Sequence, residues 1–178
     1  MVERFSEDDW IKIGFSLLKE DGSSALTIGN LCKRAERTTG SFYFHFQNMN
    51  GFIKALTSTW VSEFTDSITA INPSTHQRRD LLNLLVVRLD LELESGIRRL
   101  AERYGFIQTL VSQADSKRIN WLSMLYEQTG NYSQQEASDL AEIEYAAFIG
   151  FRLVNPNLTA SRSRELYEAF LSFTQRSS

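Results

Sequence analysis

The chain has 178 residues, enough for a small domain joined to a larger one or for one all-helical domain, and its 42% hydrophobic content allows a sizeable core. Its net charge of −3 excludes a protein coated in positive charge, although nucleic-acid binding needs positive charge only locally. The single cysteine, Cys32, excludes an intrachain disulfide and fits the reducing cytoplasm, where we expect the protein to act. No uncharged apolar run reaches the roughly 18 residues of a membrane span, so no membrane partner is expected.

Only Pro73 and Pro156 interrupt the periodic apolar runs, which predicts an all-α protein of about nine helices. The first helix is expected to begin after Ser6, a good N-cap that is followed by three acidic residues. Asp21 and Gly22 should end it. Its apolar stripe consists of Trp10, Ile13, Leu17 and Leu18.

Two short helices are expected between Thr27 and Phe46. Thr27 is the N-cap of the first, whose apolar face includes Cys32, interpreted as a packed core thiol rather than a redox sensor. The second begins at Thr38 or Thr39 and places Phe42 and Phe46 on one buried side. Its outer face is small and polar, which suits insertion into a DNA major groove. That outer face consists of Thr39, Gly40, Ser41, Tyr43 and His45.

The stretch TIGNLCKRAERTTGSFYFHFQNMNGF, above all GSFYFHF followed by Asn48, resembles the helix-turn-helix of TetR-type transcriptional repressors. The segment EASDLAEIEYAAFIGF is similar to their regulatory domains. The resemblance covers nearly the whole chain and implies a DNA-binding domain, residues 1–50, and a helical ligand-binding and dimerisation domain, residues 51–178. It also implies a pocket for an unknown small-molecule effector, with no other cofactor, and a homodimer on a near-palindromic operator.

The chain departs from the family pattern at four positions. Glu36 stands where the family usually has glycine, and Arg37 where it usually has an apolar residue. Met49 and Asn50 stand where lysine and glutamate are usual. The missing lysine is expected to remove one phosphate contact, which Arg37, in the turn, would partly replace.

Candidate DNA contacts follow from the outer face and the nearby cations. Tyr43 is expected to bind a phosphate, and Thr38, Thr39 and His45 to reach bases. The alternative for each is a solvated surface residue, and for the cations an ordinary charged helix face. The candidates are Thr27, Lys33, Arg37, Thr38, Thr39, Gly40, Ser41, Tyr43 and His45.

The rest of the chain is expected to form further helices. Their expected ranges are 49–71, 76–95, 97–103, 106–128, 133–156 and a last helix from Thr159 or Ser161. The run in 76–95 is apolar on nearly every side, as in the centre of a bundle, and Gly96 should break the chain after it. Ser133 and Glu136 have the spacing of a capping box.

Effector-binding candidates lie on these helices: Trp60, Phe64, Arg88, Glu92, Trp121, Tyr126 and Tyr145. The aromatic residues have an alternative role as plain core. Arg88, on a leucine-rich stripe, needs either an ion pair with Glu92 on the same stripe or an anionic ligand.

A homodimer is also expected from the residues themselves, because segment 145–151 is apolar on two faces and the last helix can cover only one. The interface candidates are Ala146, Ala147, Gly150, Leu166, Phe170 and Phe173. An enzyme is not expected, since His45 and His76 have no nucleophile motif and no cluster has metal-ligand spacing. A helical interaction or sensor module without specific DNA binding remains the alternative function.

Overall fold

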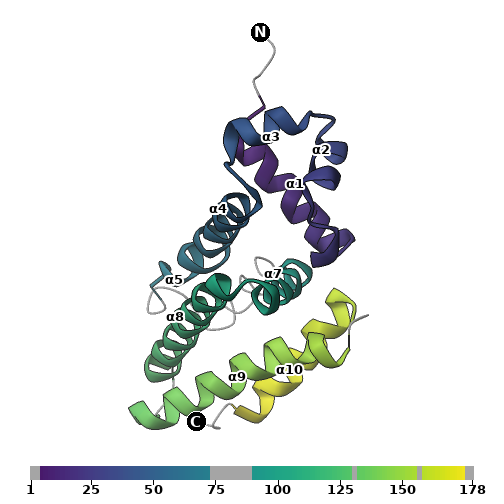
Figure 1. Ribbon diagram of the computed structural model, residues 1–178. Coiled ribbons are helices and arrows are strands. Elements are labelled where there is room, and N and C mark those ends of the chain that lie inside the picture. Colours follow the sequence, from purple (N-terminus) through teal and green to yellow (C-terminus); the bar gives the residue numbers. More distant parts are fainter. Residues whose placement is uncertain (1–4, 73–89, 130–131, 156–157, 175–178) are drawn as a thin grey trace. The chain divides into compact units, whose positions relative to one another are not determined.

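The computed structural model describes residues 5–72, 90–129, 132–155 and 158–174 (Figure 1). Every regular element within these ranges is a helix, which confirms the all-α prediction. No helix in the described ranges is long and apolar enough to cross a membrane.

The chain packs as two compact units. The first contains residues 1–64 together with 90–112, and the second contains 65–89 together with 113–178. These two units are defined by which residues pack together, not by function. The division into a DNA-binding domain, 1–50, and a regulatory domain, 51–178, concerns function and stays a prediction.

Helix α1 (Glu7–Glu20) begins and ends as its sequence predicts. The Ser6 hydroxyl accepts a hydrogen bond from the Asp9 N–H, and the Ser6 N–H donates to the Asp9 carboxylate at 2.8 Å, forming a capping box. The Ser6 backbone bond is the main reason that the pKa of Asp9 lies below its usual value. Gly22, with φ of +79°, turns the chain into the short 3-10 helix η1 (Ser23–Ala25).

The next three helices also begin at the expected caps. The side chains of Thr27, Thr38 and Asn48 cap α2 (Ile28–Ala35), α3 (Thr39–His45) and α4 (Met49–Val61). Each cap accepts a hydrogen bond from a backbone N–H that the helix itself leaves unsatisfied. The predicted limits of the helix-turn-helix segment are therefore confirmed.

The helix expected over 49–71 is not a uniform α-helix. After α4 comes a π-helical turn, η2 (Ser62–Asp66), and then α5 (Ser67–Thr69). A π-turn inserts one residue into a helix and shifts the faces of the residues that follow. Apolar spacing alone does not distinguish this arrangement from a continuous helix.

Helix α7 (Leu91–Arg103) corrects two predictions. Asp90 has an extended backbone and caps α7, so one continuous helix across 76–95 is wrong: a new helix begins after Asp90, with Glu92 in its first turn. Gly96 does not break the chain. It lies buried inside α7, where an added Cβ would approach the Leu18 Cβ to 3.1 Å, so it permits close packing of α7 on α1.

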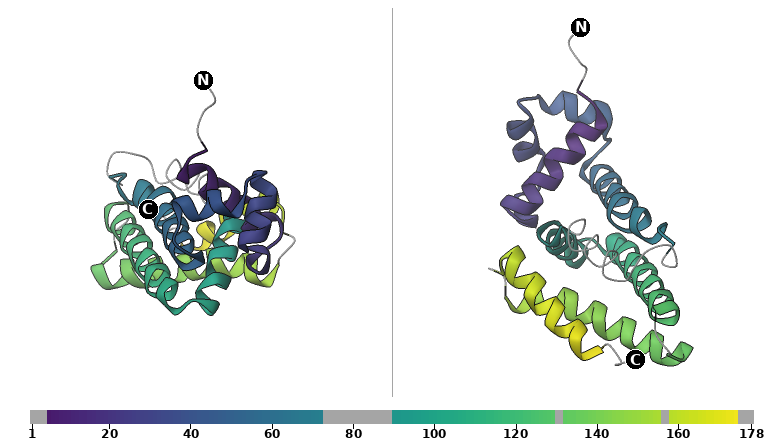
Figure 2. Two further views of the ribbon diagram at one scale, coloured as in Figure 1. Left: turned by 45° about the horizontal axis from the view of Figure 1, so that its top comes forward. Right: turned by 180° about the vertical axis from the view of Figure 1, so that it is seen from behind.

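The last helices match the prediction closely. They are α8 (Gly105–Thr129), α9 (Gln134–Val154) and α10 (Ala160–Thr174). Ser133 and Glu136 form the predicted capping box. Helices α9 and α10 lie side by side (Figure 2).

Gly14 provides a test of the packing between α1 and α4. A Cβ at this position would lie 2.4 Å from the Leu56 Cδ1 and 2.7 Å from the Phe52 Cζ. Both side chains are fully buried, so Gly14→Ala should lower the free energy of unfolding by about 1–3 kcal/mol through overpacking. The control is Gly29→Ala, where nothing lies within 4 Å of the new methyl group. It should raise stability by roughly 0.5 kcal/mol, because alanine favours a helix over glycine. Equal effects in denaturant unfolding would refute the packing account.

Candidate nucleic-acid interface

A cluster of aromatic side chains fixes the orientation of α3. Phe42 is fully buried, and its ring centroid lies 5.4 Å from that of Trp10 on α1 and 5.6 Å from that of Phe52 on α4. Phe46 is 4% exposed and lies 5.0 Å from Phe52. The prediction that Phe42 and Phe46 form the buried side of this helix is confirmed, so the opposite side must face outward.

The turn between α2 and α3 is made by Glu36 in the left-handed conformation, with φ of 52° and ψ of 42°. The Arg37 N–H then donates to the Cys32 carbonyl at 3.0 Å and closes the end of α2. A left-handed backbone costs a residue with a Cβ roughly 1–2 kcal/mol. The turn therefore has the geometry that favours glycine, although the chain places glutamate there.

The predicted outer face of α3 is accessible. Thr39 and Gly40 are exposed, Ser41 and His45 are half-buried, and Tyr43 is 54% exposed. Because three hydroxyl groups and one imidazole share a surface only seven residues long, this face can donate and accept several hydrogen bonds.

Two further candidates, Thr27 and Thr38, have a structural role as N-caps. The Thr27 hydroxyl accepts from the Asn30 N–H at 3.2 Å, and the Thr38 hydroxyl accepts from the Ser41 N–H at 3.3 Å. Both side chains are exposed, and a hydroxyl that accepts one bond can still donate another. Capping is therefore compatible with the predicted DNA contacts.

Sequence reasoning missed Phe44, whose side chain is 67% exposed, more than that of Tyr43 beside it. Its ring meets the His45 ring edge-on, with centroids 5.1 Å apart. The sequence could have predicted this exposure. Phe44 comes two positions after the buried Phe42, and residues two apart point to opposite sides of a helix.

The cations near α3 differ in how far their charge is already used. The Arg34 guanidinium contacts the Glu20 carboxylate at 2.5 Å and the Asp21 carboxylate at 3.0 Å. The hydrogen bond to Glu20 is the main reason that the pKa of Arg34 is raised. Lys33 and Arg37 are exposed and have no ion pair among the described residues. The Arg37 guanidinium lies over the Phe5 ring, 5.0 Å from its centroid.

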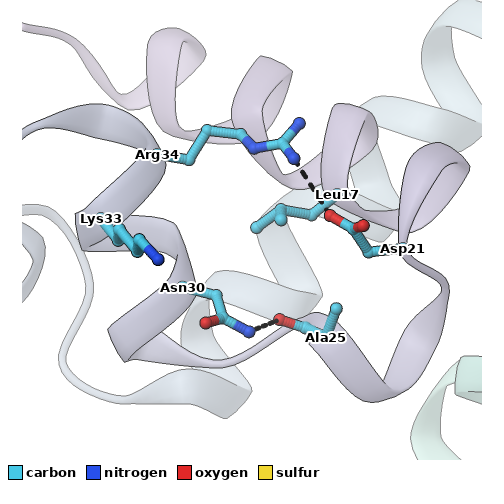
Figure 3. A pocket seen from close by; sticks show the side chains of 6 residues that line it. All are labelled: Leu17, Asp21, Ala25, Asn30, Lys33 and Arg34. Atoms are coloured by element: carbon cyan, nitrogen blue, oxygen red, sulfur yellow. Dashed lines mark hydrogen bonds and ion pairs between the residues drawn. The ribbon is translucent and has the colours of Figure 1, made fainter.

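An open pocket of about 490 Å³ lies beside these cations, between the end of α1 and α2 (Figure 3). It is lined by Leu17, Asp21, Ala25, Asn30, Lys33 and Arg34. Arg34 is bound to Asp21, and the Asn30 amide donates to the Ala25 carbonyl at 2.8 Å. The Lys33 ammonium is the remaining cation of the lining, and Lys33 is exposed.

The predicted effector residues lie in different parts of the structure. Trp60 is buried and Phe64 half-buried in the first unit, and Glu92 is exposed on α7. Arg88 lies outside the described residues. Trp121, Tyr126 and Tyr145 are brought together in the buried cluster of the second unit. Effector binding by any of them stays a prediction.

The tyrosines of this buried cluster belong to a buried network of hydrogen bonds that the sequence did not reveal. Fully buried Glu144 on α9 accepts hydrogen bonds from the hydroxyls of Tyr126 on α8, at 2.5 Å, and Tyr167 on α10. The Tyr145 hydroxyl donates to Asp115 at 2.6 Å and accepts from the Arg118 guanidinium at 3.1 Å. One carboxyl group thus joins three helices. Buried polar networks of this kind fix a particular packing, because each group requires its partners.

The predicted dimer residues differ in exposure, and Phe170 packs against the buried cluster of the second unit. Ala146 is exposed, Gly150 is half-buried with nothing within 4 Å of an added Cβ, and Phe173 is 88% exposed. Ala147, Leu166 and Phe170 are half-buried. Ile143 and Val154 on α9, which were not among the candidates, are 55% and 78% exposed.

Neither metal nor thiol chemistry is indicated in the described part of the chain. No group of three or more His, Cys, Asp or Glu side chains there is placed to hold a metal ion. Burial raises the pKa of the Cys32 thiol, which disfavours the reactive thiolate. This agrees with the interpretation of Cys32 as a packed core residue.

The comparison with solved structures finds a similar fold in a transcriptional regulator of the TetR/AcrR family from Aquifex aeolicus VF5. The two chains share 16% identity with a TM-score of 0.66, and the match covers 95% of this chain and 99% of the other. No protein-family model matches the sequence, and no curated protein gives a significant match. The chain therefore has the fold of a TetR/AcrR-type regulator over nearly its whole length.

The left-handed turn predicts the effect of placing glycine at position 36. Glu36→Gly should raise the free energy of unfolding by about 0.5–1 kcal/mol, since relief of the strain outweighs the flexibility that glycine adds to the unfolded chain. Glu36→Ala removes the same carboxylate but keeps the Cβ, so it should bring no such gain. Thermal unfolding of both variants gives the comparison, and equal midpoints would show that the turn stores no strain.

Proposed function

We propose that this protein is a transcriptional regulator, a repressor, that binds near-palindromic DNA as a homodimer and responds to a small-molecule effector. The observation that carries the proposal is α3, a short helix that is anchored by buried Phe42 and presents hydroxyls, an imidazole and a glycine outward. Such a helix fits the major groove, where base edges offer donors and acceptors. The fold shared with a TetR/AcrR-family regulator supports the same function.

The distribution of charge is compatible with this function. Arg34 is neutralised by Glu20 and Asp21, whereas Lys33 and Arg37 remain available for phosphates on either side of the turn. Few cations mean a modest electrostatic contribution to affinity, so base contacts must supply much of the discrimination. Tyr43, whose side chain is 54% exposed, would add a phosphate contact through its hydroxyl.

The homodimer is supported by an exposed apolar stripe on α9. Ile143, Ala146, Gly150 and Val154 follow one another at spacings of three or four residues, so they share one face of the helix. Glycine and alanine on that face would allow a second helix to approach closely. A second copy of the chain, pairing its own α9 and α10 with these, would form a four-helix interface.

The effector is proposed to bind in the second unit. The aromatic residues Trp121, Tyr126 and Tyr145 and the network around Glu144 provide polar groups within an apolar setting, which is typical of small-molecule sites. A ligand that replaced one tyrosine hydroxyl on Glu144 would alter how α8, α9 and α10 pack.

The DNA-binding proposal predicts an enriched sequence in a randomised-site selection with the full-length protein. The sequence should contain two half-sites related by two-fold symmetry and about one or more helical turns apart. Thr39→Ala should relax the preference at one position in each half-site, and Tyr43→Phe should weaken binding to all duplexes similarly. Ser24→Ala, which removes an exposed hydroxyl elsewhere in the same unit, should change neither. A selection without enrichment would instead favour the helical interaction module.

The dimer proposal predicts that Gly150→Arg gives monomers in analytical ultracentrifugation, because a charged side chain would enter the apolar interface. Gly105→Arg is the matched control. Gly105, like Gly150, has nothing within 4 Å of an added Cβ, and it is an exposed residue of α8 that does not belong to the apolar stripe of α9. It should leave the dimer intact. An unchanged dimer for Gly150→Arg would exclude this interface.

A further inference from the structure

We propose that Phe44 contacts the 5-methyl group of a thymine in each half-site and so selects T over other pyrimidines at that position. This inference rests on the proposed DNA-binding function and deepens it. It assigns a specificity role to Phe44, an apolar residue of α3 whose side chain is 67% exposed.

The position of Phe44 on α3 follows from the buried anchor. Successive residues of an α-helix are about 100° apart, so Phe44 lies about 200° from Phe42, on the side directly opposite the core. Gly40, one turn earlier, shares that outermost side. Since Gly40 has no side chain, nothing at that position holds the helix away from a partner, and Phe44 would lie at the centre of the contact.

The surroundings of Phe44 separate its role from that of its neighbours. Ser41 and Tyr43 flank the outermost side and carry hydroxyls, which suit phosphates and base-edge donors and acceptors. A phenyl ring has no such groups. In the major groove its apolar complement is the methyl group of thymine, the one apolar feature of the base edges there.

The Phe44 ring is already packed against a neighbouring side chain before DNA is bound. It packs edge-on against His45, at an interplanar angle of 85°. His45 in turn lies 6.2 Å from buried Phe46, measured between ring centroids, which connects the exposed ring to the core. A pre-oriented side chain loses less conformational freedom on binding than a mobile one.

The test replaces thymine with uracil, which removes only the methyl group. Starting from the duplex enriched in the selection, each thymine is changed to deoxyuridine in turn, symmetrically in both half-sites, and the affinity is measured at fixed salt. At one position the wild-type protein should bind roughly fourfold more weakly per half-site, as the burial of one methylene-sized group gives. For both half-sites of the dimer the loss should be roughly fifteenfold.

Variants assign the effect to Phe44. Phe44→Ala should bind the thymine and uracil duplexes equally, whereas Phe44→Leu should keep part of the difference because its side chain is still apolar. Met124→Ala removes an exposed apolar side chain from α8, in the other unit, and should keep the full difference. A melting curve for each variant verifies that the fold is retained.

Several results would overturn the inference, and they differ in what they say of the proposed function. If no duplex is enriched, both fail. If a duplex is enriched but no thymine is sensitive to loss of its methyl group, or if Phe44→Ala keeps the sensitivity, the inference fails and DNA binding stands. If Phe44→Ala changes the sedimentation of the free protein and leaves the thymine-to-uracil ratio unaltered, Phe44 is a protein contact instead.

Discussion

Burial of Phe42 between Trp10 and Phe52 is the interaction on which the outer surface of the first unit depends. Helix α3 has only seven residues, too few to be stable alone in water, so its existence and its rotation about its axis both come from this contact. Once Phe42 points inward, helical geometry directs Gly40 and Phe44 outward and Tyr43 to one side. The candidate recognition surface is thus a consequence of core packing.

The same dependence explains which features the sequence predicted well. Caps such as Ser6, Thr27 and Asn48 were predictable because an N-cap requires only a few neighbouring residues. The role of Gly96 could not be predicted from the sequence, because a glycine can either end a helix or permit close approach of another element. Only the tertiary contact with Leu18 distinguishes the two. For the same reason, the apolar run up to residue 95 did not reveal that Asp90 would cap a new helix.

Buried polar groups were the least predictable part of the second unit. Glu144 lies in a helix that also carries the exposed residues Glu142 and Ile143, and nothing in its local sequence marks it as buried. Its partners, Tyr126 and Tyr167, are 18 and 23 residues away along the chain. Sequence periodicity identified Tyr126 and Tyr145 as aromatic candidates but could not tell ligand contacts from a satisfied network, because that difference depends on which hydroxyls meet which carboxylates.

The proposed function also explains why net charge is a poor guide for this chain. A surface that reads DNA needs positive charge near phosphates, but charge that is already paired contributes little attraction. The ion pairs of Arg34 with Glu20 and Asp21 neutralise its charge and join α1 to α2. They therefore help to hold α2 in place beside the turn at Glu36. Lys33 and Arg37, on either side of it, keep their charge exposed. If the protein binds DNA as proposed, this limited electrostatic attraction means that discrimination between sequences would come from the groups that α3 presents. Its apolar centre and polar flanks would provide two different kinds of contact.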